Sequence, residues 1–175
     1  ADLDCRVIRY GNDSSLDYSA TNILHDKKGE ASFDLVKSGE FIDRISLSVN
    51  GDHNVSNALS AIAVADLLGV PFTKIKEGLK SFHGTDRRFE YKGEVNGVTV
   101  IDDYAHHPTE ITATISAAKM TDYNELWVVF QPHTYTRTYA LLNDFAAALK
   151  ECDHVIVADI YAAREKDTGL VSSSE

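Results

Sequence analysis

Residues 102–110, with the sequence DDYAHHPTE, bring two carboxylates, a phenol and two imidazoles into one short segment. The segment follows the apolar run 98–101 and precedes a stretch in which Ile111 and Ile115 recur at helical spacing. This order predicts a strand, a polar turn and a helix. Loops at strand ends carry many binding and catalytic groups, because a rigid scaffold positions them. We therefore expect a functional site at this turn.

Two further polar segments follow apolar runs in the same half of the chain. QPHTYTRT (131–138) comes after the run 126–130, and DIYAARE (159–165) comes after the run 155–157. If the three runs are parallel strands joined by helices, their carboxyl ends share one edge of a sheet, where ligands of open α/β sheets bind. Helices that start near Pro108 and Thr136 would add backbone N–H groups for an anion.

The patterns predict an α/β protein with two domains. Residues 1–50 alternate apolar and polar positions between turns at 27–30 and 37–40, which is typical of short strands. Helices are expected from Asn54, as N-cap, to about Gly69, and again from Thr73. The polar stretch 83–90 indicates a boundary, which gives domains 1–86 and 87–175; the second is expected to contain a mostly parallel, Rossmann-like sheet.

Composition narrows the classes of partner. The chain has 27 acidic and 17 basic residues and a net charge of −10, which disfavours a nucleic-acid partner or an anionic membrane surface. No apolar run approaches the ~18 residues of a membrane span, so we expect no membrane insertion. Cys5 and Cys152 lack metal-ligand spacing, and no metal site is expected within the chain. This cysteine usage indicates a reducing, cytoplasmic location.

Each candidate residue also has a purely structural interpretation. Asp102 and Asp103 could cap the helix that follows, and His107 could be a surface turn residue. Asn54 could cap its helix while Asn57 faces solvent, instead of pairing with a base edge or a ribose together with His53. The adjacent arginines 87 and 88 could be a solvated pair, although an arginine at a hinge can reach a phosphate when two domains close.

Five segments together resemble the Mur ligases. They are GDHNVSNALSAIAVA (51–65), FHGTDRRFE (82–90), VIDDYAHHPTEI (100–111), FQPHTYTRT (130–138) and DIYAARE (159–165). The resemblance covers nearly the whole chain from Ser48 onward. It implies that residues 1–86 are the end of a central ATPase domain and that residues 87–175 are most of a C-terminal Rossmann-like domain.

The resemblance also implies an activity. Mur ligases use ATP and Mg²⁺ to phosphorylate a carboxylate, and the acyl phosphate is then attacked by an amine. The segment QPHTYTRT is similar to that of the family members that join L-alanine to UDP-N-acetylmuramate in peptidoglycan precursor synthesis. The magnesium ligands of the family would lie outside this chain.

Site residues follow by matching the family's motifs. His53, Asn54 and Asn57 match the stretch that contacts the adenine side of ATP, and Asp103 matches the acid that holds the ribose hydroxyls. Two further matches are catalytic: Arg88 corresponds to the arginine that reaches the phosphates on domain closure, and His106 to a residue at the acyl phosphate. The amino-acid site is matched by Tyr104, His106 and Arg137, and a guanidinium can hold the alanine carboxylate bidentately. Thr134 departs from the pattern, since some members carry a second arginine there.

The chain contains neither GxxxxGK[ST] nor GxGxxG, so a phosphate cradle must come from elsewhere. We therefore expect this polypeptide to be inactive alone. Two alternatives stay open: a ligase that recycles murein tripeptide, whose HHPTE turn is similar, and a nucleotide-binding module without catalysis.

Overall fold

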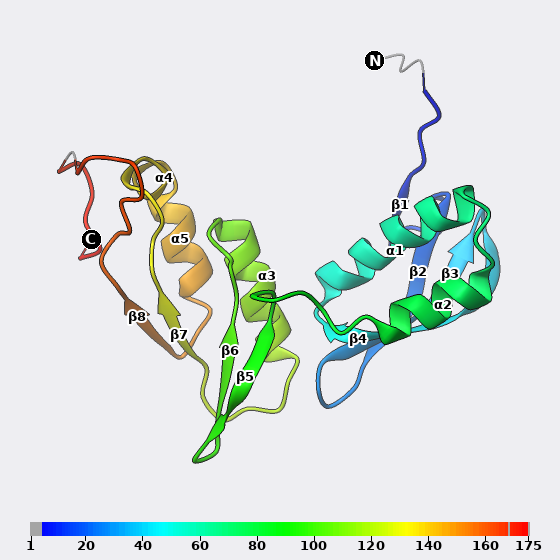
Figure 1. The fold of residues 1–175 in the computed structure, drawn as a ribbon, viewed down its shortest axis with the longest axis horizontal. Helices are drawn as coiled ribbons and strands as arrows, with labels where there is room; N and C mark the ends of the chain where they lie inside the picture. The colour runs from blue at the N-terminus through cyan, green and yellow to red at the C-terminus, as the bar shows by residue number, and fades with distance from the viewer. Residues whose placement is uncertain (1–4, 168, 175) are drawn as a thin grey trace. The chain divides into compact units, whose positions relative to one another are not determined.

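The computed structural model describes residues 5–167 and 169–174. The chain divides into two compact units, Ala1–Asp86 and Arg87–Glu175 (Figure 1). Strands and helices occur in both units, and the expected α/β class is confirmed.

The first unit contains a four-stranded sheet in the order β1-β2-β3-β4. Its strands are β1 (Tyr10–Gly11), β2 (Tyr18–His25), β3 (Glu30–Lys37) and β4 (Glu40–Asn50). β1 is parallel to β2, whereas β2, β3 and β4 are antiparallel neighbours. Buried side chains alternate along β3, as expected for a sheet with one face against a core.

Helices α1 (Asp52–Leu67) and α2 (Phe72–Ser81) follow this sheet in the sequence. Phe33 and Leu35 from β3 and Leu59 and Ile62 from α1 are fully buried in one core cluster. The prediction that Asn54 is the N-cap of α1 is wrong. The N-cap is Gly51, whose φ of 89° suits a residue without a Cβ, and Asn54 lies in the first turn.

The second unit begins with an antiparallel hairpin of β5 (Glu90–Val95) and β6 (Val98–Asp102). The helix α3 (Pro108–Lys119), the strand β7 (Trp127–Phe130), the helices α4 (Tyr135–Ala140) and α5 (Leu142–Leu149) and the strand β8 (His154–Val157) follow. β7 and β8 are parallel neighbours in register, so the crossover between them is of the predicted βαβ type. The strand β5 was not expected from the sequence.

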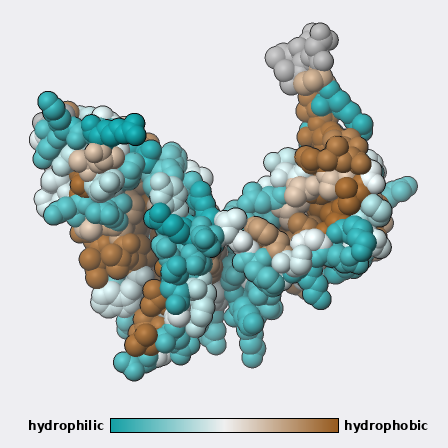
Figure 2. Space-filling view, viewed as in Figure 1, coloured by the Kyte–Doolittle hydropathy of each residue, from teal (hydrophilic) through white to brown (hydrophobic). Residues whose placement is uncertain are grey.

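One face of β7 packs against the helices. Phe130 is buried with its ring centroid 5.2 Å from that of Phe145 on α5, in a cluster that includes Ile111 and Ile115 of α3. The other face exposes apolar side chains, because Val129 on β7 is 73% exposed and Ile156, its partner in register on β8, is 50% exposed. Hydrophobic surface is visible on this unit in Figure 2.

Among the helices of the described residues, none combines the length and the apolar character that crossing a membrane requires.

Candidate functional site

The segment between β6 and α3 is held by its own side chains. His107 is the N-cap of α3: its ring nitrogen accepts a hydrogen bond from the backbone N–H of Thr109 (3.3 Å). Glu110 closes a capping box by accepting from the N–H of His107 (3.2 Å). The structural alternative in which Asp102 or Asp103 caps α3 is therefore wrong.

Asp103 instead ties the start of the second unit to this segment. One carboxylate oxygen accepts from the backbone N–H of Phe89 (2.9 Å), and the other accepts from that of Ala105 (2.7 Å). The N–H of Tyr104 donates to the carbonyl of Arg87 (2.7 Å), and the Arg87 guanidinium lies 4.5 Å from the centroid of the Tyr104 ring. The residues that open the unit are thus bound to the segment after β6 by hydrogen bonds and a cation–π contact.

His106 lies at the centre of this segment. Its Nδ1 is 2.9 Å from the carbonyl oxygen of Tyr104, and its backbone N–H donates to a carboxylate oxygen of Glu110 (2.9 Å). Its own carbonyl accepts from Nη1 of Arg137 (3.5 Å), which lies in α4, the short helix after β7. The backbone and the ring of His106 are therefore fixed from several directions, while the ring is still partly exposed.

Arg88 reaches the same segment through Glu110. Its Nη1 lies 3.7 Å from one oxygen of Glu110, and Nδ1 of His106 lies 3.5 Å from the other. Burial acts to raise the pKa of Glu110, but hydrogen bonds from the backbone of His106 and His107 and the charges of His106 and Arg88 hold it below its ordinary value. Glu110 is therefore an anion at neutral pH.

The loop after β7 has an unusual backbone at Thr134. This residue has φ 68° and ψ 146°, a region that is nearly restricted to glycine. The conformation is held at both ends: the N–H of Thr134 donates to the carbonyl of Tyr161 (3.0 Å), and its carbonyl accepts from Oγ1 of the buried Thr138 (2.7 Å). Such a position is typical of functional loops, where surrounding contacts stabilise a strained backbone. The expected helix N-terminus near Thr136 belongs to α4, which has only six residues.

The loops after β7 and β8 extend the pairing of those two strands. Tyr161 bridges to His133 in parallel, and its N–H donates to the carbonyl of Pro132 (2.8 Å). Glu165 accepts from the backbone N–H of Thr136 (2.9 Å) and also from its hydroxyl. These hydrogen bonds hold the pKa of the Glu165 carboxyl below its ordinary value, so it stays charged beside the start of α4.

Aromatic rings connect the three loops. The centroid of the His106 ring lies 5.2 Å from that of Tyr104 and 6.5 Å from that of His133. The His133 ring stacks on Tyr161 at 5.6 Å. The structure thus brings together the polar segments that follow β6, β7 and β8. We call these three segments, residues 102–110, 131–138 and 159–165, the strand-end cluster. It contains four of the predicted residues, Asp103, Tyr104, His106 and Arg137, and Arg88 contacts it through Glu110.

The remaining predicted residues lie in the first unit, at the start of α1. The side-chain amide of Asn54 donates to the carbonyl of Asn50 (2.8 Å), and that of Asn57 donates to the side-chain oxygen of Asn54 (3.0 Å). Asn57 is exposed and contacts Asn54 one turn earlier, while His53 is an exposed neighbour. Donor and acceptor groups of the two amides are left over for a ligand such as a base or a sugar.

Four residues of the strand-end cluster were inside segments singled out from the sequence but had no role assigned: Glu110, His133, Tyr161 and Glu165. Their contacts depend on strand register and on long-range packing, which residue types alone do not reveal. The role of Glu110 was the easiest of the four to predict from the sequence, because an acidic residue three positions after an N-cap is a known capping signal.

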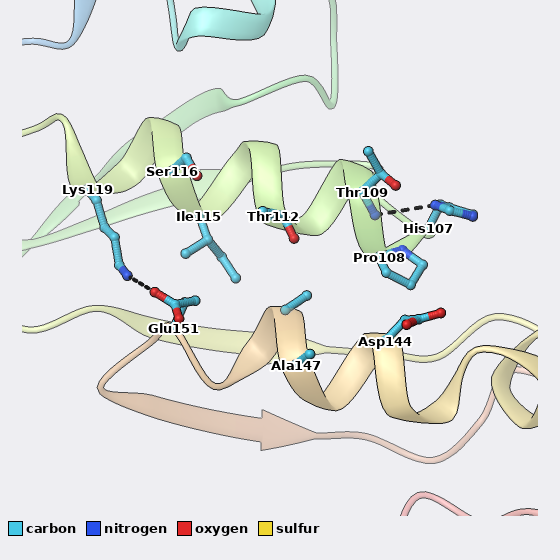
Figure 3. Close-up of a pocket in the computed structure, with 11 residues that line it drawn as sticks. His107, Pro108, Thr109, Thr112, Ile115, Ser116, Lys119, Asp144, Ala147 and Glu151 are labelled. Atoms are coloured by element: carbon cyan, nitrogen blue, oxygen red, sulfur yellow. Dashed lines mark hydrogen bonds and ion pairs between the residues drawn. The ribbon is translucent and has the colours of Figure 1, made fainter.

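A groove of about 620 Å³ lies on the helical side of the second unit, between α3 and α5 (Figure 3). Small side chains such as Ala147 and Ser116 leave it open, and the ion pair of Lys119 with Glu151 (2.8 Å) lies at one end. Lys119 is the last residue of α3 and Glu151 follows the C-terminus of α5, so the pair lies away from the loops after β6 and β7. His107, Pro108 and Thr109 line the other end of the groove, where α3 begins.

Within residues 5–167 and 169–174, no group of three or more His, Cys, Asp or Glu side chains is placed to hold a metal ion. The strand-end cluster, with Arg88 beside it, instead offers the guanidinium groups of Arg88 and Arg137, the imidazoles of His106 and His133, and the rings of Tyr104 and Tyr161. Guanidinium groups bind carboxylates and phosphates through paired hydrogen bonds. The arrangement is therefore suited to an anionic substrate that carries a carboxylate or a phosphate.

Comparison with known families assigns both units. A model described as the Mur ligase middle domain matches residues 1–65, and one described as the Mur ligase glutamate ligase domain matches residues 87–173. Two curated relatives are both named UDP-N-acetylmuramate–L-alanine ligase. The one from Lachnoclostridium phytofermentans is 50% identical over 184 residues, and the one from Clostridium acetobutylicum is 55% identical over 169 residues. The alignments cover 99% and 97% of this chain but only 39% and 37% of those relatives.

Solved structures support the same family assignment. The UDP-N-acetylmuramate–alanine ligase MurC from Thermotoga maritima matches 88% of this chain and 34% of its own, with 34% identity and a TM-score of 0.74. A murein peptide ligase from Psychrobacter arcticus matches 85% of this chain and 31% of its own, with 32% identity and a TM-score of 0.56. The chain thus spans less than two fifths of the length of the relatives named here, and both of its units match domains of one family. The chain belongs to the Mur ligase family.

Proposed function

We propose that this chain is part of an ATP-dependent ligase that joins L-alanine to UDP-N-acetylmuramate through an acyl phosphate. In this proposal residues 1–86 are the end of the central ATPase domain, and residues 87–175 are the C-terminal domain that presents the amino acid. The observation that carries the proposal is the strand-end cluster, in which Arg137 contacts His106 and Glu110 lies between His106 and Arg88. The names of the curated relatives support the choice of L-alanine.

Each residue has a role that its position allows. The Arg137 guanidinium binds the carboxylate of the incoming L-alanine, while Tyr104 and His106 flank the amino acid. Arg88 binds phosphate oxygens and so stabilises the charge that develops as the acyl phosphate forms and breaks down. His106 presents an imidazole to the acyl phosphate and the amine, where it can hold or accept a proton.

Residues of each unit match positions that contact ATP in the family. His53, Asn54 and Asn57 at the start of α1 would contact the adenine side, and Asp103 would bind the ribose hydroxyls. Both Asp103 oxygens already accept backbone N–H groups, so the ribose would use their remaining lone pairs. When bound, Mg²⁺ supplies charge compensation for the phosphates, and we expect its ligands outside this chain.

The acyl phosphate has to be protected from water until the amine arrives, and domain closure provides this protection in enzymes of this kind. The chain has no phosphate-cradling GxxxxGK[ST] segment. We therefore propose that the 175-residue chain alone does not turn over ATP, and that activity requires the longer ligase to which it belongs. The same proposal places that ligase in the cytoplasm, where its nucleotide substrates are made.

The test is phosphate release by the longer ligase with ATP, Mg²⁺ and UDP-N-acetylmuramate, comparing L-alanine with murein tripeptide as the acceptor. Release that depends on L-alanine supports the proposal. Release only with the tripeptide would assign the chain to the recycling ligase, and no release with either acceptor would favour a nucleotide-binding module. The 175-residue chain, assayed in parallel, is expected to release none.

A further inference from the structure

We propose that Glu110 is a positioning residue that couples Arg88 to His106, in addition to capping α3. The inference rests on the proposed function for its catalytic consequence, because it assigns a role to a residue of the same site. Its structural part, the coupling of the two side chains through one carboxylate, stands independently of the reaction.

The two oxygens of Glu110 have different partners. Oε2 accepts from the backbone N–H groups of His106 (2.9 Å) and His107 (3.2 Å), and it lies 3.5 Å from Nδ1 of His106. Oε1 faces Nη1 of Arg88 at 3.7 Å. In a capping box, Glu110 needs to accept only the backbone N–H of the N-cap residue, which is His107 here. The contacts with Arg88 and with the His106 ring exceed what the cap needs.

These contacts join parts of the unit that are distant in sequence. Arg88 precedes β5, and Glu110 lies in the first turn of α3, so the hairpin of β5 and β6 separates them. Asp103 ties Phe89 to the same segment, which keeps the backbone beside Arg88 close to Glu110. The guanidinium uses one edge for Glu110 and keeps other N–H groups for an anion.

The chemical consequence concerns orientation and charge. One anion lies between a guanidinium and an imidazole, so it keeps the two groups close together and offsets the repulsion between them when the ring is protonated. Arg137 on α4 contacts the carbonyl of the same His106, and a shift of His106 would therefore also change the contact with α4. Loss of the Glu110 charge should change the positions of Arg88 and His106 together.

Glu110→Gln separates positioning from capping. The glutamine keeps an acceptor for the backbone N–H groups but loses the charge that attracts Arg88 and His106, whereas Glu110→Ala loses both. Glu151→Gln is the matched control, because it removes a carboxylate paired with Lys119 in the same unit, away from the strand-end loops. Thermal unfolding of each variant of the 175-residue chain shows whether the fold is kept.

The first readout does not depend on catalysis. In NMR spectra of the chain, Glu110→Gln should shift the imidazole resonances of His106 and the guanidinium resonances of Arg88, and should leave those of His154 unchanged. Glu151→Gln should shift neither His106 nor Arg88. If Glu110→Gln folds normally and both residues keep their wild-type resonances, the coupling is absent and the inference is overturned.

The second readout is a double-mutant cycle in the longer ligase. Glu110→Gln should lower kcat/KM for L-alanine-dependent phosphate release about fivefold, as for loss of a partly exposed ion pair. Added to Arg88→Ala, it should cost much less than it does alone, while Glu151→Gln should have no effect in either background. Fully additive effects of Glu110→Gln and Arg88→Ala would overturn the positioning role. Inactivity of the unmodified ligase would contradict the proposed function and leave the NMR result to decide the coupling.

Discussion

The guanidinium of Arg137 on α4 lies 3.5 Å from the carbonyl oxygen of His106 and so joins this helix to the segment after β6. One nitrogen of the guanidinium is used in this contact, and the others are available for a ligand. The site for the amino acid is therefore expected where α4 meets the segment after β6.

The first prediction concerns Arg137→Ala in the longer ligase. If Arg137 binds the alanine carboxylate, its loss should raise the KM for L-alanine by about tenfold or more, because a charge-assisted, bidentate interaction is lost. The KM for ATP should change far less. Steady-state phosphate release with each substrate varied in turn measures both constants.

Arg9→Ala is a suitable control, because Arg9 is an exposed residue of the first unit that pairs with Asp17 (3.6 Å). It should leave both KM values unchanged. An unchanged KM for L-alanine in Arg137→Ala would rule out the proposed role of Arg137.

The second prediction concerns Asp103, whose two oxygens accept the backbone N–H groups of Phe89 and Ala105. Asp103→Ala leaves both donors without this acceptor and should lower the free energy of unfolding of the second unit by about 2 kcal/mol. Amide hydrogen exchange at Phe89 and Ala105 should become faster. Asp102→Asn should have a much smaller effect, because Asp102 contributes only a 3.8 Å ion pair with the exposed Arg87. Unchanged exchange at both amides in Asp103→Ala would show that the Asp103 carboxylate does not protect the N–H groups of Phe89 and Ala105.

Several elements could be predicted from periodicity because their apolar positions recur regularly. The strand expected at 98–101 is β6 (Val98–Asp102), and the helices expected after residues 54 and 108 are α1 and α3. β5 (Glu90–Val95) escaped prediction because its sequence, EYKGEV, is largely polar and its side chains are mostly exposed. It also contains Gly93 at an irregularity in its pairing with β6, which breaks the alternation that marks a strand.

The strand-end cluster was predictable as a location but not as a set of contacts. The order of strands and polar segments predicted that Tyr104, His106 and Arg137 lie at one edge of a single parallel sheet. The structure brings these residues together, but β6 pairs with β5 in an antiparallel hairpin while β7 pairs with β8. The stack of His133 on Tyr161 arises from a parallel bridge between loops, which depends on the register of β7 with β8. Register of this kind is set by packing of the whole unit and is not readable from residue types.

The third prediction concerns the backbone of Thr134, with φ 68° and ψ 146°. Glycine adopts this conformation readily, so Thr134→Gly should relieve strain and raise the free energy of unfolding by about 1 kcal/mol, after the entropy of the more flexible unfolded chain is included. Thr134→Ala keeps a Cβ and should give no such gain. Urea unfolding of both variants measures the difference. Equal or lower stability of Thr134→Gly relative to Thr134→Ala would show that the conformation carries little strain.

The fourth prediction concerns Tyr18 on β2, which donates its hydroxyl hydrogen to Asp66 on α1. Burial, followed by the hydrogen bond and charge of Asp66, raises the pKa of Tyr18 to about 12. The unfolded chain loses this proton near pH 10, so the native state binds more protons than the unfolded state between about pH 10 and 12. The contribution of this pair is therefore fully present below pH 10 and falls as the pH rises through this window.

Tyr18→Phe removes the titrating group and should make the free energy of unfolding less dependent on pH between about 10 and 12. Asp66 sets the dependence of stability on pH at the acidic end. Hydrogen bonds from Lys37 and Tyr18 lower its pKa, so its contribution to the free energy of unfolding is lost as the pH falls below the ordinary carboxyl range. Tyr10→Phe is the matched control, since Tyr10 is an exposed tyrosine of the same unit. Urea unfolding at pH 9, 10, 11 and 12 compares the three proteins. If wild type and Tyr18→Phe have the same alkaline slope, the Tyr18–Asp66 hydrogen bond does not contribute to the stability of the first unit in this way.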